Sequence, residues 1–527
     1  MKLTRRAALT AAALPLVPRL ARAAEDGTLT RGNRYEPATL DPHKINTTYE
    51  LAIAGDLFEG LVTFDAEGQA KPGLSASWST SPDGKRYTFR LREGLTWSDG
   101  MPLTADDVVY SFRRLLDPAT AGVFAALLYI VKGARAMNGG TAPAAGLGVS
   151  APDLATVLID LDAPAPYLPQ ILANAYCAVV PRHVIAAAGD AWTRPGAMVS
   201  SGAYTLESWR PHEAIALVRN PRYHDAANVR VSRVVYVPTE DLTSAVARFR
   251  SGELDMQIDM PLSQVERLRA ELPLEARLSP TLITYYLAVN TMEPKFGDGR
   301  VRRALSLAID RDVLTQKVLR GGEVPAASFV SPMVSGYKPP QMEFADAGVD
   351  VRLAEARKLL TEAGFGDGVS LSVTYSHSSS LDLRRIAVVI AGMWKRIGVQ
   401  TTLYNTEGKV HFANMRQGSF EVAFAGWQAD YNDPLGFLYV LDSSTVRSNY
   451  ARYRNPAYDG LLAKAAGMEN AGVRIGLLRE AESLVLRDQP IIPLYYGVTK
   501  NLVSRRVVGW RANAVDVHLS RYLSVVD

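Results

Sequence analysis

The sequence predicts an α/β fold built from two or three domains, and two observations lead to this prediction. Short strand-like runs alternate with amphipathic helical segments along the chain, which is the pattern of α/β units. The 527 residues also exceed what one domain of roughly 150 residues holds. The hydrophobic content of 47% and the charged content of 21% are ordinary for a globular protein. Composition therefore favours a folded, multidomain chain.

The first 23 residues have the features of an export signal. A basic start (residues 2–6) precedes a mildly apolar stretch (residues 7–17), and Ala21-Arg22-Ala23 is typical of a cleavage site. The pair Arg5-Arg6 resembles a twin-arginine signal, and an ordinary secretory signal containing Arg-Arg is the alternative. In both cases we expect cleavage near Ala23 and export of the remaining chain.

Loss of the signal changes the net charge of the chain. The segment carries five basic residues and no acidic residue, so the formal charge falls from +4 to −1 in the remaining 504 residues. A nearly neutral body argues against a nucleic-acid-binding face. The only cysteine, Cys177, cannot form an internal disulfide, and no cysteine near residue 23 offers a lipid-anchor site. The longest later apolar run, residues 123–131, is too short to span a bilayer. We therefore expect a chain that is free in the exported compartment.

The first α/β unit is predicted near residue 90. Residues 87–91 place Tyr, Phe and Leu on alternate positions, which predicts a strand, and a turn follows at residues 98–100. A helix is predicted from Thr104, because Asp107 stands three positions later at the spacing of a capping box. Pro118 ends this helix.

Further helices and strands follow the same rules. An apolar stripe over residues 301–320 predicts one long helix ended by Gly321-Gly322. Other segments with helical periodicity are 353–365, 383–398, 458–467 and 472–490, while residues 399–405 and 491–499 have strand character.

Catalytic and metal-binding signatures are missing from the sequence. It contains no nucleophile elbow, Walker loop or dinucleotide-binding glycine motif, and its seven histidines never occur at His-x-x-x-His spacing. Asp430, Asn432 and Asp433 superficially suggest a calcium loop, but Pro434 occupies a ligand position of that pattern. We therefore predict no catalytic residue, no metal and no cofactor.

The stretch FEVAFAGWQADYNDP, residues 420–434, places a carboxylate beside aromatic residues. From the residues alone, Asp430 is either a turn cap or a ligand contact. Asp433 is better placed for the turn because it precedes Pro434. Aromatic residues with a few fixed polar groups are typical of clefts that hold organic ligands.

Many ordered motifs together resemble one protein family. They include LDPHKI, DLFEGLVTFDAEGQAKPGLSASW, YTFRLREGLTWSDGMPLTADDVVYSF, SSGAYTLESW, RVRRALSLAIDRDVL and GWQADYNDP. The chain resembles the extracellular solute-binding proteins of family 5, and among them the periplasmic oligopeptide-binding proteins of ABC importers. This resemblance implies an α/β, two-lobed periplasmic binding protein fold with a hinge and an extra inserted subdomain (type II, cluster C-like). Lobe I would comprise residues 24–58, 182–283 and 498–527, with the inserted subdomain at 59–181, and lobe II residues 284–497.

The resemblance also implies a set of ligand-binding residues. In peptide-binding relatives, the Asp of the ADY motif, here Asp430, pairs with the free α-amino group of the peptide. Main-chain groups at Gly426 and Gln428 would pair with the peptide backbone as an added strand, and Trp427 would wall a side-chain pocket. The other expected cleft residues are Phe124, Asn46, Thr48, Tyr285 and Asp259.

The sequence departs from the family pattern at the far end of this site. Phe424 stands where broad oligopeptide binders place a basic residue for the peptide carboxylate, and Leu383 aligns with a His of some relatives. We therefore expect a monomeric periplasmic protein that delivers a peptide or peptide-like ligand to an inner-membrane permease. A non-peptide ligand such as an opine, a metal chelate or a sugar oligomer is the alternative. A secreted hydrolase is the remaining one, and the missing catalytic signatures argue against it.

Overall fold

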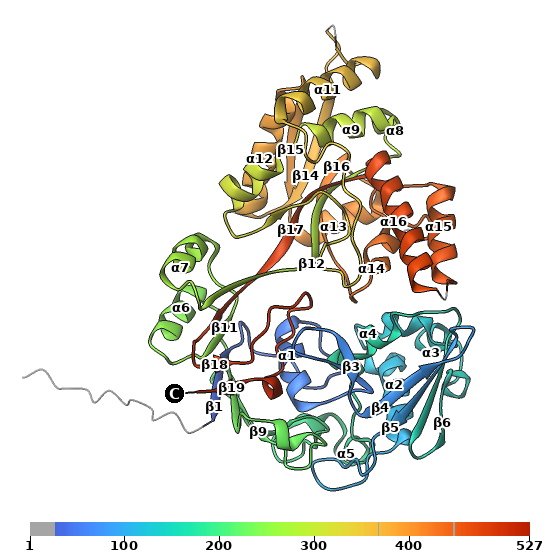
Figure 1. The fold of residues 1–527 in the computed structure, drawn as a ribbon, viewed down its shortest axis with the longest axis vertical. Coiled ribbons are helices and arrows are strands. Elements are labelled where there is room, and N and C mark those ends of the chain that lie inside the picture. Colours follow the sequence, from blue (N-terminus) through green and yellow to red (C-terminus); the bar gives the residue numbers. More distant parts are fainter. Residues whose placement is uncertain (1–26, 367, 446–447, 469, 527) are drawn as a thin grey trace, which may run out of the picture.

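The computed structural model describes residues 27–366, 368–445, 448–468 and 470–526, so the predicted signal at 1–23 lies outside the described residues. Two lobes lie one above the other in Figure 1, with β12 (Ala276–Val289) and β17 (Ile491–Val503) running between them. The described C-terminal end, with β18 (Val507–Val508) and β19 (Ser524–Val525), returns to the lower lobe. The lower lobe is lobe I and the upper one lobe II. Among the helices described, none is long and apolar enough to cross a membrane.

One eleven-stranded sheet extends through both lobes in the order β15-β14-β16-β12-β17-β11-β1-β10-β9-β8, with β13 attached to β17. Its lobe I strands are β1 (Thr28–Gly32), β8 (Tyr204–Arg210), β9 (Ala214–Arg219), β10 (Arg233–Val237) and β11 (Met256–Ile258). Its lobe II strands are β13 (Val324–Pro325), β14 (Ser372–Ser378), β15 (Gln400–Thr406) and β16 (Val422–Gln428). The helices that flank the lobe I part are α1 (Thr48–Leu57), α5 (Arg182–Ala188), α6 (Leu242–Arg250) and α7 (Val265–Glu271).

A second sheet, in the order β4-β5-β7-β6, forms within the predicted insertion of lobe I. Its strands are β4 (Ser75–Thr80), β5 (Arg86–Leu91), β6 (Val149–Asp153) and β7 (Thr156–Asp160), beside the pair β2 (Val62–Phe64) and β3 (Ala70–Pro72). Helices α2 (Ala105–Leu116), α3 (Ala134–Asn138) and α4 (Leu168–Leu172) accompany them. The predicted capping box at the start of α2 is confirmed, because Thr104 N–H donates to Asp107 Oδ2 at 3.0 Å.

Lobe II contains most of the remaining helices. They are α8 (Pro294–Gly297), α9 (Gly299–Leu307), α10 (Arg311–Val313), α11 (Val349–Glu362), α12 (Leu381–Lys395), α13 (Gly408–Gln417), α14 (Leu435–Leu438), α15 (Pro456–Ala466) and α16 (Ala471–Asp488). Each helix predicted from periodicity in this lobe has a counterpart at the expected place, except for one that is interrupted.

The prediction of one continuous helix over residues 301–320 is wrong. Helix α9 ends at Leu307, and α10 begins after Asp310, whose carboxylate accepts from Val313 N–H at 3.2 Å. A capping carboxylate starts a new helix because it satisfies a free N–H of the first turn. A six-residue π-helical segment follows, and Arg320, in the left-handed region with φ +56°, ends it before the expected glycines.

The two strands that join the lobes are irregular where they cross. Residues 276–280 of β12 pair with β17 in one register, which breaks between Pro280 and Thr284 and shifts again between Tyr285 and Tyr286. Gly497 lies opposite this break, and a Cβ there would stand 2.8 Å from Ile283 Cβ. The strands therefore approach closely where only glycine fits. We propose this break as the hinge, beside the predicted lobe boundaries at residues 283 and 497.

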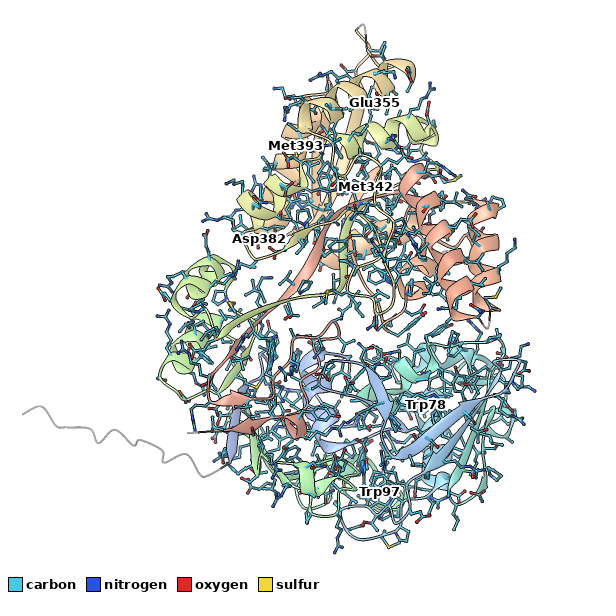
Figure 2. The ribbon with its side chains drawn as sticks, in the orientation of Figure 1. Trp78, Trp97, Met342, Glu355, Asp382 and Met393 are labelled. Carbon is cyan, nitrogen blue, oxygen red and sulfur yellow. The ribbon has the colours of Figure 1, made fainter. Side chains whose placement is uncertain are left out.

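Separate hydrophobic cores stabilise the two lobes. Trp97 is fully buried in the core of the inserted subdomain, while Met342 and Met393 belong to a lobe II core. Figure 2 shows these side chains well inside their own lobes. Because each lobe buries its own apolar surface, the lobes are able to move as bodies about the two connecting strands.

The buried side chain of His43 should make lobe I less stable in mild acid. Its Nε2 lies 3.1 Å from Ala178 O, and its Nδ1 lies 2.9 Å from Arg114 Nη1, so the neutral ring donates to one and accepts from the other. Burial, with the Arg114 charge, lowers the pKa of His43 to about 4. A lowered pKa means that the unfolded state binds the proton more tightly.

The contribution of His43 is therefore complete above the ordinary pKa of 6.5 and is lost as the pH falls towards 4. We expect urea unfolding to show a loss of about 2 to 3 kcal/mol over this range, and His43→Gln to remove much of it. The exposed His212 provides the matched control His212→Gln, which should leave the pH dependence unchanged. An equal pH dependence in wild type and His43→Gln would contradict this assignment.

Candidate functional site

Strand β16 presents an open edge between the lobes. It pairs with β12 over its whole length but with β14 only at Val422 and Ala423. Bonds from Ala429 N to Leu282 O and from Asn290 N to Glu421 O, each 2.9 Å, fix which residues bond towards β12. In an antiparallel ladder the alternate residues face the other way. The N–H and C=O groups of the even-numbered residues from 424 to 428 therefore point to the open edge.

Among the described residues, a side chain occupies the first of these open positions. His411 Nε2 lies 2.9 Å from the carbonyl oxygen of Phe424. The main-chain groups of Gly426 and Gln428 that point away from β12 have no strand partner within the described part of the chain, because β14 pairs with β16 only at Val422 and Ala423, and both residues are exposed. Unpaired strand edges accept an extended partner chain. These main-chain groups of Gly426 and Gln428, called the rail below, are therefore geometrically available to a ligand.

Asp430 follows this strand and carries a largely buried carboxylate. No cation of the described residues lies within ion-pair distance of it, and no described backbone N–H donates to it. Burial raises its pKa, and hydrogen bonding by the neighbouring Tyr439 hydroxyl opposes part of that shift. A buried carboxylate without a positive partner is costly, so this site favours the arrival of a cation.

The turn after Asp430 is held by a different carboxylate. Asp433 Oδ1 accepts from Leu435 N–H at 2.9 Å, and both of its oxygens accept from Arg474, at 2.7 and 2.8 Å. Asp433 therefore caps the turn and is neutralised by a cation. Because Asp433 caps this turn, the turn-cap explanation does not apply to Asp430.

Aromatic side chains from both lobes surround Asp430. Tyr176 of the inserted subdomain stacks on Phe124 at 4.4 Å between ring centroids. Burial raises the pKa of Tyr176, and the negative charge of Asp430 across the lobe boundary contributes to the same shift. On the lobe II side, Trp427 packs edge-on against Tyr439 and donates from Nε1 to Gly436 O at 2.7 Å.

The lobes touch at this end of the cleft. Tyr167 of the inserted subdomain stacks on Tyr431 of lobe II with ring centroids 4.5 Å apart and planes 10° apart. Arg474 lies 5.9 Å from the Tyr167 ring and so places that ring against a second lobe II residue.

Two cavities continue from the rail, and they share Ile283 and Gln428. The first, of about 350 Å³, lies in lobe II and is lined by the predicted residues Tyr285 and Phe424. The second, of about 430 Å³, lies at the hinge and is lined by the predicted residues Thr48 and Asp259. The two cavities are thus lined by Gly426, Gln428 and four other predicted residues.

Two of the predicted residues differ from the simplest expectation. Asn46 is exposed and lines neither of these cavities, while its N–H donates to Glu50 Oε2 at 2.9 Å as part of the approach to α1. Asp259, in the left-handed region with φ +69°, has Arg34 Nε at 3.6 Å. Asp259 therefore already has a cation beside it, unlike Asp430.

Sequence reasoning missed Tyr176, Tyr439 and His411 as neighbours of the site. Each comes from a segment remote from residues 424–430 or carries no local motif, so only folding brings it there. Among the residues described, no group of three or more His, Cys, Asp or Glu side chains is arranged to hold a metal ion.

Comparison with known proteins identifies the family of this chain. Residues 69–449 match the model of bacterial extracellular solute-binding proteins, family 5 (middle region). This chain belongs to that family. The family 5 protein is 39% identical over 512 residues to the periplasmic oligopeptide-binding protein OppA of Salmonella typhimurium, covering 96% of this chain and 94% of OppA. The resemblance drawn from the motifs is therefore confirmed.

Solved structures confirm the two-lobed fold of this solute-binding protein. The unliganded open form of the murein tripeptide-binding protein MppA matches with a TM-score of 0.89 and 35% identity, covering 96% of this chain and 98% of MppA. Haemophilus influenzae OppA in complex with the peptide RPPGFSPFR matches with a TM-score of 0.75 and 33% identity, covering 95% and 99%. At similar identity, the chain matches the open form of MppA with the higher TM-score.

Proposed function

We propose that this family 5 protein is the periplasmic substrate-binding component of an ABC importer, and that it captures peptides or peptide-like compounds with a free amine between its lobes. The observation that carries the proposal is the Asp430 carboxylate, which is largely buried yet has no cationic partner among the described residues. A ligand ammonium would supply the missing charge. Taking an ammonium group out of water is costly unless a charged, hydrogen-bonding partner receives it.

The open edge of β16 supports a peptide rather than an isolated amine. Gly426 and Gln428 offer main-chain donors and acceptors at alternate positions, starting two residues from Asp430. An extended peptide with its amine at Asp430 would pair with them as an added strand. Main-chain pairing is independent of side chains, which suits an importer that accepts many sequences. The names of the relatives, oligopeptide- and murein tripeptide-binding proteins, agree with this ligand class.

Delivery would depend on closure of the lobes about β12 and β17. A ligand shifts this equilibrium only as far as it binds the closed state more tightly than the open one. Contacts from both lobes near Asp430, including Tyr176 from the inserted subdomain, would strengthen on closure and supply that difference. The closed, loaded protein would then dock on an inner-membrane permease. We infer a monomer exported by the N-terminal signal, and a role in binding without catalysis.

Peptide affinity should fall in acid because of Asp430. Burial raises the pKa of this carboxyl in the free protein, and a bound ammonium would lower it again. Binding therefore favours the deprotonated state, and it weakens as the pH drops below the raised pKa, by up to about tenfold per pH unit.

Calorimetry with trialanine from pH 7 to pH 4 checks this expectation. Asp430→Asn should bind weakly and show a much flatter profile than wild type. A wild-type affinity that stays constant across the range would contradict a titrating carboxylate at the amine.

The second candidate keeps the fold and changes the ligand to a non-peptide, and the apolar residues Phe424 and Leu383 at the far end of the site favour it. Mass spectrometry of ligand released from gently purified protein separates the candidates. A mixture of peptides would support the first proposal, and a single opine, metal chelate or sugar oligomer the second. Peptides added to the purified protein and recovered intact would argue against hydrolysis.

A further inference from the structure

The lobe II cavity next to the rail is an apolar pocket without a cation. Its volume of about 350 Å³ lies near the lower end of the range for small-molecule sites, roughly 300–1,000 Å³. Its walls come chiefly from Ile283, Tyr285, Leu383, Phe412 and Phe424, and it contains neither Arg nor Lys. The pocket begins at Gly426 and Gln428, so a chain paired with that edge would pass its mouth.

The one histidine of the pocket is already engaged. His411 is buried and its Nε2 lies 2.9 Å from Phe424 O. Burial lowers its pKa, which favours the neutral ring. A peptide carboxylate placed here would lose water without gaining a positive partner, and burial of an unpaired charge is unfavourable.

The nearest cationic side chains of α12 open onto a different cavity. Arg384 and Arg385 line the space between α12 and α7, and Asp382 lies 3.4 Å from Arg385. Figure 2 labels Asp382 at the edge of lobe II that faces α7. These charges flank the apolar pocket and do not enter its lining, whose α12 member is Leu383.

Phe424 is held rigidly as the floor of this pocket. Its ring stacks on Tyr285 at 5.9 Å and 23°, and Tyr285 stacks on Tyr495 at 4.8 Å and 30°. Phe424 is only 6% exposed, so the aromatic stack is fixed by the lobe II core before a ligand arrives. A preformed apolar wall binds an apolar group without the entropy cost of ordering side chains.

We propose that this pocket selects peptides by a bulky apolar or aromatic side chain at one position along the added strand, and that it rejects an acidic group at the same position. The proposal rests on the proposed function, because the amine at Asp430 and the rail at Gly426 and Gln428 set the ligand in register. Side chains of an added strand point alternately to opposite faces of the sheet. One ligand position therefore faces Phe424 and Tyr285, while its immediate neighbours do not.

A substitution scan of the ligand tests this selectivity on the wild-type protein. Tetraalanine with a single Phe or a single Glu at each position in turn is titrated by calorimetry. We expect Phe to improve affinity about tenfold to a hundredfold at one internal position, flanked by positions with little gain, and Glu to weaken binding at that same position. Equal affinities for the Phe and Glu peptides at every position would overturn the proposal.

Variants of Phe424 show whether this pocket is responsible. Phe424→Leu should keep the preference for apolar groups with a smaller gain, and Phe424→Arg should reverse it in favour of the Glu peptide. Thermal unfolding verifies that each variant is folded. If Phe424→Arg does not fold, the scan on the wild-type protein remains the test. A preference that survives unchanged in Phe424→Arg would place selectivity elsewhere and overturn the proposal.

The scan also separates this proposal from the one on which it rests. N-acetylated peptides should bind weakly whatever their side chains if the amine anchor is correct. Loss of affinity on acetylation without any Phe preference would overturn the pocket alone. Equal binding of acetylated and free peptides, with a clear Phe preference, would overturn the amine anchor and keep the pocket.

Discussion

Replacing Asp430 with Asn should weaken the binding of a free-amine peptide by about 3 kcal/mol, which is roughly a hundredfold. The substitution keeps the size of the side chain and removes the charge, so the ligand ammonium would enter a largely buried site without a partner. The pKa values of Tyr176 and Tyr439 are both raised in part by the charge of Asp430, and Trp427 packs against Tyr439. Isothermal calorimetry with a tripeptide measures the effect.

A double-mutant cycle identifies the pair responsible. N-acetylation should cost wild type about as much as Asp430→Asn costs the free peptide, and acetylation should add little to the variant. Asp259→Asn is the matched control, since Asp259 lines the hinge cavity but has Arg34 at 3.6 Å and a 47% exposed side chain. Its effect should stay below about 1 kcal/mol. Additive effects of acetylation and Asp430→Asn would show that the carboxylate does not meet the amine.

Replacing Glu482 with Ala should lower the free energy of unfolding of lobe II by about 4 kcal/mol. Glu482 is fully buried in α16, and its carboxyl oxygens accept from Phe329 N–H at 2.9 Å, Val330 N–H at 2.8 Å and Tyr337 OH at 2.7 Å. Each buried donor left without a partner costs about 1–3 kcal/mol. Urea unfolding measures the loss, and the exposed Glu480 of the same helix gives the control Glu480→Ala, expected within about 0.5 kcal/mol of wild type.

The same residue should make unfolding depend on pH. Burial raises the pKa of Glu482 to about 8, against the opposing effect of its hydrogen-bond donors. Because the folded pKa lies above the unfolded value of 4.5, the contribution of Glu482 is complete below pH 4.5 and is lost as the pH rises through 8. Glu482→Gln should remove this part of the alkaline destabilisation. If the free energy of unfolding rises from pH 6 to 8 with the same slope in wild type and in Glu482→Gln, the assignment to Glu482 is contradicted.

Local chemistry made several elements predictable from the sequence. The capping box of Thr104 and Asp107 starts α2, and apolar periodicity located α11, α12, α15 and α16, because these signals lie within a few residues of the structure they specify. The interrupted helix at α9 and α10 is instructive for the opposite reason. Its apolar stripe was read correctly, but Asp310 caps a new helix and the buried Arg311 donates to Pro493 O of a distant strand.

The candidate site was predictable to a smaller extent. The order of residues in β16 and the family resemblance pointed to Gly426, Gln428 and Asp430 without showing which strand edge is open. That depends on how far β14 pairs with β16, and β14 stops at Ala423. The aromatic neighbours Tyr176 and Tyr439 carried no local signal, because their place beside Asp430 arises only when distant segments pack together.

By itself the sequence determined the family, the two-lobed α/β fold and the presence of two carboxylates in one short loop. Only the tertiary structure decided which of these two carboxylates has a cationic partner. Asp433 receives Arg474 from α16, whereas Asp430 is buried beside aromatic rings and has no cation among the described residues. The physical reason is that the cost of a buried charge depends on what distant segments place around it, and a sequence records only what stands beside it in the chain.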